Sequence, residues 1–395
     1  LDNAANYRKD DLQLRILAPG LGRGLLTVEG EPWRAQRRAL APLFTPRMIA
    51  GVAPALRAAA EAMTERWERR RDGQPFDAAP EMGRVTLEVL ERTIFSGGLG
   101  GAPEEVMEAV TRYFDTIGRI DPLDLLGFPA WLPRVSRLRA RPALAFFDAS
   151  VDRIIAARRA LLAADAGAAP QDLLTMLLAA RDPETGQGLP EAEVRANIVT
   201  FIGAGHETTA NTLVWTLFLL AMSPPWRARV EAEVDRVLVG DWLADDGLDR
   251  LVETKAVIEE ALRLYPPAST LTRAAVGPDE LAGQPIRAGD TIIVSPWLLH
   301  RHKKLWRRPD IFDPARFLPG ARDAIDRYAY IPFGAGPRIC IGMGFALQEA
   351  LIVLATVVRR FRLDMQPGAV VEPVQRVTLR PGNGLPVVLH RRSAP

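Results

Sequence analysis

The chain has almost no cysteine, since Cys340 is the only one among its 395 residues. A single cysteine excludes an internal disulfide and a metal site built from CxxC pairs. It also fits a reducing compartment, so we expect a cytoplasmic protein. Histidine is nearly as rare, with four residues. His300 and His302 form an HxH pair, but no further His or Cys cluster completes a zinc site around them.

Lysine is scarce as well, because nearly all of the basic residues are arginine. The net charge of +2 gives no general signal for a polyanionic partner, and nucleic-acid motifs are absent. No Walker loop and no GxGxxG opening a βαβ unit are present, so neither a built-in flavin domain nor a nicotinamide domain is indicated. Residues 1–11 lack the apolar core of a signal peptide. The most apolar long stretch, 194–222, contains Arg195, His206 and Glu207, which argues against a membrane span.

Apolar periodicity is plentiful, and 48% of the residues are hydrophobic, enough for a sizeable core. The patterns predict a helix that starts near residues 31–33, and further helices over 48–71, 83–95, 103–117, 141–163, 191–222, 226–239, 251–264 and 345–361. Short β-branched runs predict strands at 291–295, 374–379 and 386–389, and the segments 12–26 and 309–331 read as irregular. The expected fold is mainly α with a small β portion (α+β), in a single large domain spanning residues 1–395.

The decapeptide FGAGPRICIG, residues 333–342, surrounds the cysteine with three glycines. Glycine permits tight turns and close approach of another group to the backbone. The helix predicted to follow places the thiol near a helix N-terminus, where the dipole and free N–H groups favour a thiolate. A buried structural cysteine is the alternative, because a free cysteine packs as a small hydrophobe.

This decapeptide resembles the haem-binding loop of the cytochrome P450 family, FxxGxRxCxG; all of the fixed positions match, at Phe333, Gly336, Arg338, Cys340 and Gly342. The resemblance implies a P450-like fold that holds haem b between the long helix and the helix after the loop. It also implies that Cys340 is the axial ligand of the haem iron, a thiolate that favours O–O cleavage. Phe333, Arg338 and Gly342 would then contribute to cofactor binding.

The stretch AGHETT, residues 204–209, lies within the longest predicted helix. Ala204 and Thr208 are four residues apart and share one helix face. A close helix crossing with an ion-paired Glu207 is one explanation. The stretch also resembles the family's oxygen-binding groove, [AG]GxxTT. That resemblance implies catalytic roles: Thr208 hydrogen-bonds to oxygen bound at the iron, and Glu207 belongs to a proton relay.

Glu260 and Arg263 are three residues apart on a predicted helix, which alone indicates no more than a surface ion pair. The family has an ExxR pair here, joined by an arginine from a downstream segment such as Asp313–Pro314–Ala315–Arg316–Phe317 in this chain. The resemblance implies a structural role, in which Glu260, Arg263 and Arg316 lock the region behind the cysteine loop.

Trp33 and Arg37 fit a WxxxR pattern on one helix face, although a solvated basic helix gives the same pattern. Together with Arg273 and Arg338, they resemble the family's partners of the haem propionates, and the planar guanidinium suits a carboxylate. His300 is a further residue that could reach a propionate.

The resemblance implies a haem-thiolate monooxygenase that uses O₂ and two electrons to hydroxylate or epoxidise a lipophilic small molecule. No reductase domain is recognisable, so the electrons are expected from NAD(P)H through a separate ferredoxin or flavodoxin. Compared with the family pattern, the chain lacks an N-terminal segment. A non-oxygenase haem-thiolate enzyme (peroxide-driven or dehydrating), a helical binding protein without haem and a cysteine hydrolase remain alternatives.

The substrate pocket is expected on the far side of the haem, from location in the family fold. Its expected lining comprises residues 12–26, a lid at 123–131, and Ala204, Ser269, Thr270 and Leu271. Arg34, Arg38, Arg359 and Arg360 are expected to form a basic face for an acidic electron donor.

Overall fold

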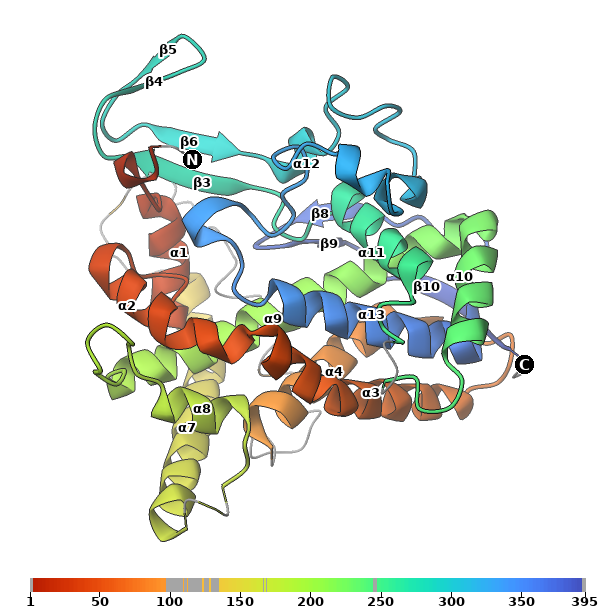
Figure 1. The fold of residues 1–395 in the computed structure, drawn as a ribbon, viewed down its shortest axis with the longest axis horizontal. Coiled ribbons are helices and arrows are strands. Elements are labelled where there is room, and N and C mark those ends of the chain that lie inside the picture. Colours follow the sequence, from red (N-terminus) through yellow and green to blue (C-terminus); the bar gives the residue numbers. More distant parts are fainter. Residues whose placement is uncertain are drawn as a thin grey trace. The chain divides into compact units, whose positions relative to one another are not determined.

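The computed structural model describes residues 3–96, 109, 112, 123, 128, 135–165, 167, 169–243 and 247–392. Helices dominate, and the strands form small antiparallel sheets, which confirms the expected mainly α class with a small β portion (Figure 1). By its internal contacts the chain divides into two compact units. Unit 1 comprises Leu1–Thr45, Leu90–Ala204 and Leu271–Val294; unit 2 comprises Pro46–Val89, Gly205–Thr270 and Ser295–Pro395. The single-domain organisation stays a prediction.

Unit 1 combines helices with a small sheet. Its helical elements are η1 (Ala4–Asn6), α1 (Asp11–Leu21), α2 (Gly30–Leu40), η2 (Ala41–Phe44), the π-helical turn η3 (Glu91–Phe95), α7 (Val135–Ala164), α8 (Leu173–Ala179) and the first part of α9 (Glu191–Met222). Its strands are β1 (Tyr7–Arg8), β3 (Leu271–Ala275), β4 (Asp279–Leu281), β5 (Gln284–Ile286) and β6 (Thr291–Val294), and β3 is paired between β1 and β6. Figure 1 shows the hairpin β4–β5 extending beyond β3 and β6.

Helix α1 corrects the expectation that residues 12–26 are irregular. The Asp10 carboxylate caps the helix by accepting a hydrogen bond of 3.0 Å from the Gln13 N–H. The helix tolerates Pro19 in its last turn and ends at Gly22, whose φ of 65° is easily reached only by glycine. The Pro19–Gly20 pair hides these end signals, because it is typical of a turn.

Unit 2 contains the main hydrophobic core, which lies between helices and one face of a sheet. Its helical elements are α3 (Pro46–Glu68), α4 (Ala79–Leu90), the rest of α9, α10 (Pro224–Val237), α11 (Val252–Leu264), α12 (Pro296–Leu299), η4 (Pro314–Phe317), η5 (Arg322–Ala324), η6 (Gly336–Arg338) and α13 (Met343–Arg360). Its strands are β2 (Pro75–Asp77), β7 (Phe361–Met365), β8 (Pro373–Gln375), β9 (Leu379–Pro381) and β10 (Pro386–Arg391), with β10 paired between β2 and β7.

The long helix α9 begins and ends where the sequence predicts, at Glu191 and Met222. Its apolar residues surround the axis, which is the pattern of a buried helix. Ser223 follows it, and the next helix, α10, begins with Pro224 and Pro225 in its first turn. Helices α3, α10, α11 and α13 are confirmed with ends shifted by a few residues.

The run 374–379, expected as one strand, is instead a hairpin of two strands, β8 and β9, with Gln375 paired to Leu379. The Arg376 N–H donates to the Thr378 carbonyl at 3.0 Å and closes the turn. The hairpin carries a hydroxyl, of Thr378, and an arginine, Arg380, that both contact Glu207 of α9.

Candidate functional site

The cysteine loop is fixed by its own backbone. The Cys340 N–H donates to the Phe333 carbonyl at 3.0 Å, and the Ile339 N–H donates to the Gly336 carbonyl at 3.1 Å. Gly334 and Gly336 have φ of 73° and 71°, values that a side chain at either position would strain. Phe333 packs against the core of unit 2 and anchors the loop. Two tight turns therefore present Cys340 from a rigid base.

The Cys340 side chain is exposed and lies three residues before Met343, the first residue of α13. The positive end of an 18-residue helix and its free N–H groups favour the thiolate over the thiol. A buried structural cysteine is therefore contradicted. An exposed sulfur on a loop whose glycines let a flat group approach the backbone suits a soft iron centre, so these residues fit a haem.

Within α9, consecutive residues of the AGHETT stretch contact different partners. The buried His206 ring places Nε2 3.0 Å from the carbonyl oxygen of Gly83 in α4, and burial lowers the pKa of His206 to about 4. His206 is therefore neutral at pH 7. Thr208 is half-buried, and its carbonyl accepts a hydrogen bond of 2.9 Å from the Thr212 hydroxyl one turn later.

Glu207 is held by the hairpin β8–β9. Its Oε1 accepts a hydrogen bond of 2.6 Å from the Thr378 hydroxyl and lies 3.8 Å from Nη1 of Arg380. The Thr378 hydroxyl in turn accepts a hydrogen bond of 3.0 Å from the Asn211 amide, one helical turn after Glu207. The Glu207 side chain stays about one-fifth exposed, at 21%. It thus combines access to water with a fixed position.

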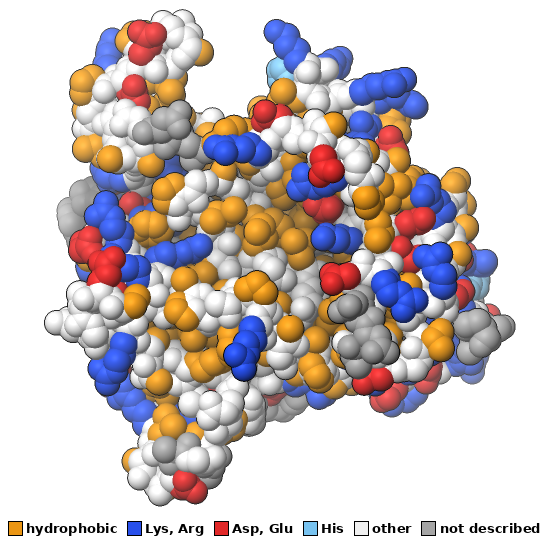
Figure 2. Space-filling model, viewed as in Figure 1, with side chains coloured by type: hydrophobic (Ala, Val, Ile, Leu, Met, Phe, Trp, Pro, Cys, Tyr) orange, Lys and Arg blue, Asp and Glu red, His pale blue; other side chains and the backbone are white. Residues whose placement is uncertain are grey.

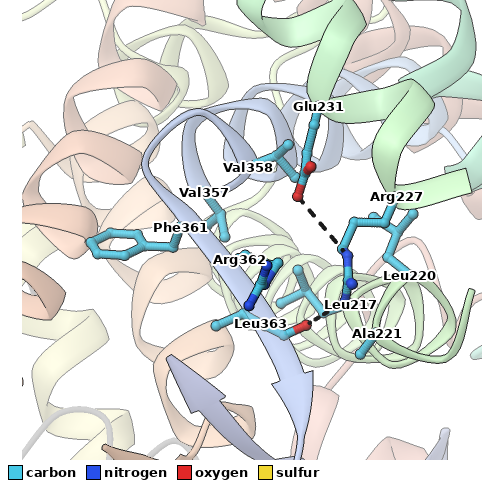
Figure 3. A pocket seen from close by; sticks show the side chains of 10 residues that line it. All are labelled: Leu217, Leu220, Ala221, Arg227, Glu231, Val357, Val358, Phe361, Arg362 and Leu363. Atoms are coloured by element: carbon cyan, nitrogen blue, oxygen red, sulfur yellow. Dashed lines mark hydrogen bonds and ion pairs between the residues drawn. The ribbon is translucent and has the colours of Figure 1, made fainter. Parts of the chain in front are cut away.

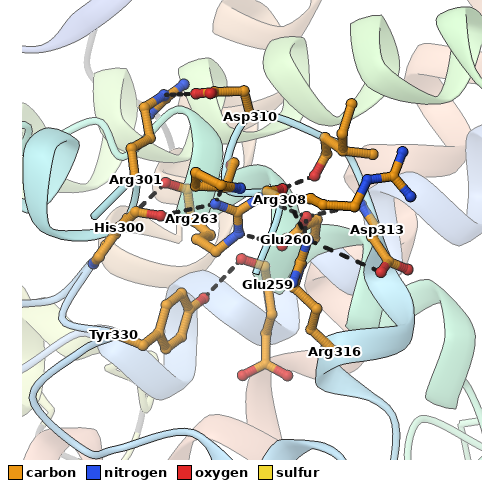
Figure 4. Close-up of polar contacts among 12 residues, drawn as sticks. Glu259, Glu260, Arg263, His300, Arg301, Arg308, Asp310, Asp313, Arg316 and Tyr330 are labelled. Carbon is orange, nitrogen blue, oxygen red and sulfur yellow. Dashed lines mark hydrogen bonds and ion pairs between the residues drawn. The ribbon is translucent and has the colours of Figure 1, made fainter. Parts of the chain in front are cut away.

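The predicted lock of Glu260, Arg263 and Arg316 is present, and its first two members are fully buried (Figure 4). Arg263 contacts Glu260 through two parallel bonds, of 2.6 Å from Nε and 2.8 Å from Nη2. Arg316 Nε lies 3.5 Å from Glu260 Oε1. Glu260 Oε1 also accepts a hydrogen bond of 2.8 Å from the Asp313 N–H. Burial raises the pKa of Glu260, while Arg263 acts in the opposite direction.

Arg263 also ties down the segment that follows α12. Its Nη1 donates to the carbonyls of His300 and Pro309 at 2.8 and 2.6 Å, and Nη2 donates to Ile311 at 3.1 Å. The segment between α12 and η4 has little regular structure, so these side-chain bonds satisfy carbonyls that no sheet or helix would. The lock therefore positions the chain that leads into the cysteine loop.

His300 is not a propionate ligand, because it is fully buried and both ring nitrogens have protein partners. Figure 4 shows the ring beside Arg263. Nε2 accepts a hydrogen bond of 2.9 Å from the Ile331 N–H, so the proton is on Nδ1, which lies 3.2 Å from the Arg263 carbonyl. Burial lowers the pKa of His300 to about 4. The neutral ring joins the end of α11 to the start of the cysteine loop.

The predicted propionate partners divide between the two units. Trp33 and Arg37 lie on α2 and Arg273 lies on β3, all in unit 1, whereas Arg338 lies in unit 2. Each of these side chains is half-buried. Arg273 Nη1 donates to the Thr272 carbonyl at 2.7 Å. Their joint role stays a prediction.

A buried amide pair positions α2, and sequence reasoning missed it. The Asn197 side chain of α9 donates a hydrogen bond of 3.0 Å to the Gln36 side chain and accepts one of 2.8 Å from the Leu25 N–H. Gln36 in turn donates to the Arg23 carbonyl at 3.1 Å. Both amide side chains are buried. The helix that carries Trp33 and Arg37 is therefore joined to α9 and to the loop after α1.

The predicted pocket residues have mixed surroundings. Ala204 and Thr270 are exposed and Leu271 is half-buried, whereas Ser269 is buried and its hydroxyl donates to Gln375. The segment 12–26 is largely helical, as α1. The lid at 123–131 falls outside the described residues except for Leu123 and Phe128.

A small cavity of about 20 Å³ lies elsewhere in unit 2, among α9, α10, α13 and β7 (Figure 3). Such a volume holds about one water molecule. Arg227 lines it and donates to the Leu363 carbonyl at 3.4 Å. None of the predicted site residues lines this cavity, so it is not the candidate site.

Two observations bear on partners and membranes. Figure 2 shows positive and negative side chains interspersed over the visible face, as the small net charge implies. In the described part of the chain, no single helix has both the length and the apolar character to cross a membrane; one bent pair, Gly30–Phe44 with Pro46–Glu68, passes by length and composition alone.

The cytochrome P450 family model matches residues 3–386, nearly the whole chain. The protein belongs to the cytochrome P450 family. This P450 is 37% identical to cyclooctatin synthase of Streptomyces melanosporofaciens over 92% of its own length and 78% of the relative's. It is 36% identical to pentalenene oxygenase of Streptomyces avermitilis, over 91% of this chain and 78% of the relative. A crystal structure of the cytochrome P450DA heme domain matches it with a TM-score of 0.87 at 28% identity, covering 99% of this chain and 85% of that one.

Membership establishes the predicted enzyme class. The protein is a haem-thiolate monooxygenase whose cofactor is haem b, and it uses O₂ and externally supplied electrons on lipophilic molecules. The alternatives without haem and the non-oxygenase readings are thereby set aside. Besides Gln36 and Asn197, the residues that the sequence did not reveal are Asn211 and Thr378, together with the ring contacts of His300. No local motif identifies Thr378, because its partner Glu207 is 171 positions away in the sequence.

Proposed function

We propose that this P450 oxidises a terpene-like hydrocarbon or alcohol, with Cys340 as the iron ligand and Glu207 and Thr208 as the proton relay. The observation that carries the proposal is the exposed Cys340 on its rigid loop at the start of α13. The substrate class is supported by relatives named for pentalenene and for cyclooctat-9-en-7-ol, the latter 37% identical. A hydrocarbon or a monohydric alcohol offers little to hydrogen-bond, so an apolar pocket suits it.

Bound haem supplies an iron centre that activates O₂ and delivers one oxygen atom to a C–H or C=C bond. Cys340 Sγ supports this chemistry by donating electron density to the metal. The tight turns at Gly334 and Gly336 hold the sulfur, and the N-terminus of α13 keeps it ionised. Arg338 lies within the same loop and would pair with one haem propionate. Trp33, Arg37 and Arg273 would be the further partners of the propionates.

The relay begins at the Glu207 carboxylate, which reaches water with about a fifth of its side chain exposed. Glu207 takes a proton from solvent, and the neighbouring Thr208 hydroxyl passes protons toward the site of O–O cleavage. The hydroxyl can both accept and donate a hydrogen bond, so it transfers a proton without carrying charge. Consecutive placement on the rigid helix α9 keeps the two groups in fixed order.

A separate ferredoxin or flavodoxin, reduced from NAD(P)H, is the proposed electron donor. A reducing, cytoplasmic compartment suits a chain whose only cysteine must remain a thiolate. Of the four arginines expected to face the donor, three are paired with carboxylates: Arg34 with Glu31, Arg38 with Asp182 and Arg360 with Glu68. Arg359 is exposed, at the end of α13.

The reduced, CO-treated protein tests the role of Cys340. Wild type is expected to show the red-shifted Soret band that thiolate ligation produces, and Cys340→Ala is expected to lose it. Met343→Leu is the matched control, because Met343 is an exposed sulfur residue three positions away and should leave the band unchanged. A thiolate band that survives in Cys340→Ala would contradict the proposal.

Spectral titration tests the substrate class. Terpene hydrocarbons and alcohols are expected to shift the Soret band of the oxidised protein at lower concentrations than fatty acids of equal carbon number. Tighter binding of the fatty acids would reject the terpene proposal and would leave the role of Cys340 untouched.

A further inference from the structure

Three α9 residues spaced four apart contact the same short hairpin. Glu207 contacts Thr378 and Arg380, Asn211 contacts Thr378, and Trp215 Nε1 donates to the Leu379 carbonyl at 3.3 Å. Residues at i, i+4 and i+8 share one helix face. One stripe of α9 is thus matched to residues 378–380, and its first member is the proposed relay acid.

The hydrogen bonds within this contact have a fixed direction. Thr378 has a single hydroxyl proton, and the Glu207 carboxylate can only accept, so that proton is committed to Glu207 Oε1 at 2.6 Å. The Asn211 amide must then donate to the threonine oxygen, at 3.0 Å. Asn211 and Thr378 are both buried, so water does not compete for these bonds.

The hairpin that carries Thr378 is itself rigidly held. The Leu379 N–H donates to the carbonyl of Pro267, three residues after the end of α11, at 2.9 Å. Trp215 is fully buried and stacks on Tyr265 with ring centroids 4.0 Å apart and planes 6° apart. Functional groups must be held to within about 0.5 Å of their working position, and these contacts restrain the hairpin that carries Thr378.

We propose that Thr378 and Asn211 are positioning residues that fix Oε1 of Glu207 and so make Oε2 the oxygen that carries the relayed proton. Within the described residues, the contacts of the Glu207 carboxylate go to Oε1 alone, from Thr378 and Arg380. The inference rests on the proposed role of Glu207. It adds that a relay motif on α9 works only with its remote hydroxyl partner, which no local pattern reveals.

Thr378→Val removes the hydroxyl and keeps the side-chain shape, whereas Thr378→Ser restores the hydroxyl and serves as the rescue. Crystal structures of the haem-loaded variants give a readout that is independent of turnover. The Glu207 carboxylate is expected to leave its wild-type position in Thr378→Val and to keep it in Thr378→Ser, with α9 unmoved. An unchanged Glu207 rotamer in Thr378→Val overturns the proposal.

Turnover without substrate gives the functional readout, using NADH, a surrogate reductase and a surrogate ferredoxin. Reduction of O₂ to two waters takes four electrons and four protons, hence two NADH; release as hydrogen peroxide takes two electrons and two protons, hence one NADH. In wild type the NADH consumed per O₂ is expected to approach about two. In Thr378→Val the ratio is expected to fall to about one, and in Thr378→Ser it is expected to recover. Equal ratios in all three proteins overturn the proposal.

Glu207→Gln separates this inference from the relay it rests on. A fall in the ratio for Glu207→Gln, with none for Thr378→Val, keeps the relay and rejects the positioning role. An unchanged ratio for Glu207→Gln rejects the relay itself. The CO spectrum and the melting temperature of each variant show that haem and fold are retained.

Discussion

At the scale of single residues, two neutral buried histidines serve as connectors between elements. His206 joins α9 to α4, and His300 joins the end of α11 to the cysteine loop. Imidazole does this well because one nitrogen donates while the other accepts. Protonation removes the acceptor that His300 offers to Ile331. The His206 ring donates to the Gly83 carbonyl and keeps that hydrogen bond when protonated, but it then carries a buried charge.

We expect these two histidines to destabilise the protein below neutral pH. Each has a folded-state pKa of about 4 against an ordinary 6.5, so its contribution is fully present above pH 6.5 and is lost as the pH falls toward 4. Between about pH 7.5 and about pH 5 the loss is about 2 kcal/mol for each histidine. Urea unfolding across this range should show a shallower pH slope in His206→Gln and His300→Gln. His302→Gln, at an exposed histidine, is the matched control for the substitution itself.

At the scale of elements, the lock between α11 and η4 is expected to be essential. Arg263→Met leaves the buried Glu260 carboxylate without its bidentate partner and frees three carbonyls, which costs about 3–5 kcal/mol. The matched control is the neighbouring pair of Glu259, on the same helix α11, with Arg322 of η5. Arg322 is 40% exposed, so Arg322→Gln should cost less than about 1 kcal/mol. Thermal unfolding and the haem content of the purified variants measure both; similar losses in the two variants would contradict this account.

The loop after α1 approaches α9 so closely that a methyl group does not fit. A Cβ on Gly24 would lie 2.6 Å from the Thr200 hydroxyl and 2.8 Å from the Ala196 carbonyl. Gly24→Ala is therefore expected to destabilise by about 1–3 kcal/mol. Gly51, on an exposed face of α3 with nothing within 4 Å, provides the opposite control: Gly51→Ala should stabilise by about 0.5–1 kcal/mol. A rise in melting temperature for Gly24→Ala would show that Thr200 and Ala196 move to accept the added methyl group, and would contradict this prediction.

The sequence predicts the elements that carry their own signals. Helix α9 and the cysteine loop follow from periodicity and from glycines, and the lock follows from charges three residues apart. Helix α1 escaped because Pro19 and Gly20 mimic a turn, although Asp10 caps it. The sequence does not reveal Thr378, Asn211 or the ring contacts of His300, because their partners are 31 to 171 positions distant and lack a recognisable motif. Long-range contacts of neutral side chains leave no local pattern to find.

At the scale of the whole molecule, the small net charge means that any steering of an electron donor is local. Arg359→Glu is expected to slow electron transfer from an acidic ferredoxin by about ten-fold at low ionic strength, and the difference should shrink as salt is added. Arg34→Glu tests a second residue of the expected donor face, one whose guanidinium pairs with Glu31 at 3.1 Å. Stopped-flow rates over a series of salt concentrations measure both. Equal salt dependence in wild type and Arg359→Glu would contradict a donor site at this end of α13.

The exposed and solitary Cys340 also has an analytical consequence. Every thiol-specific reagent that modifies this protein must do so at one atom, and that atom is unavailable to the reagent once it is coordinated. The moles of label taken up per mole of chain, under native conditions, therefore count the molecules that lack cofactor. A preparation's fraction of active enzyme can be read by this titration before any substrate is known.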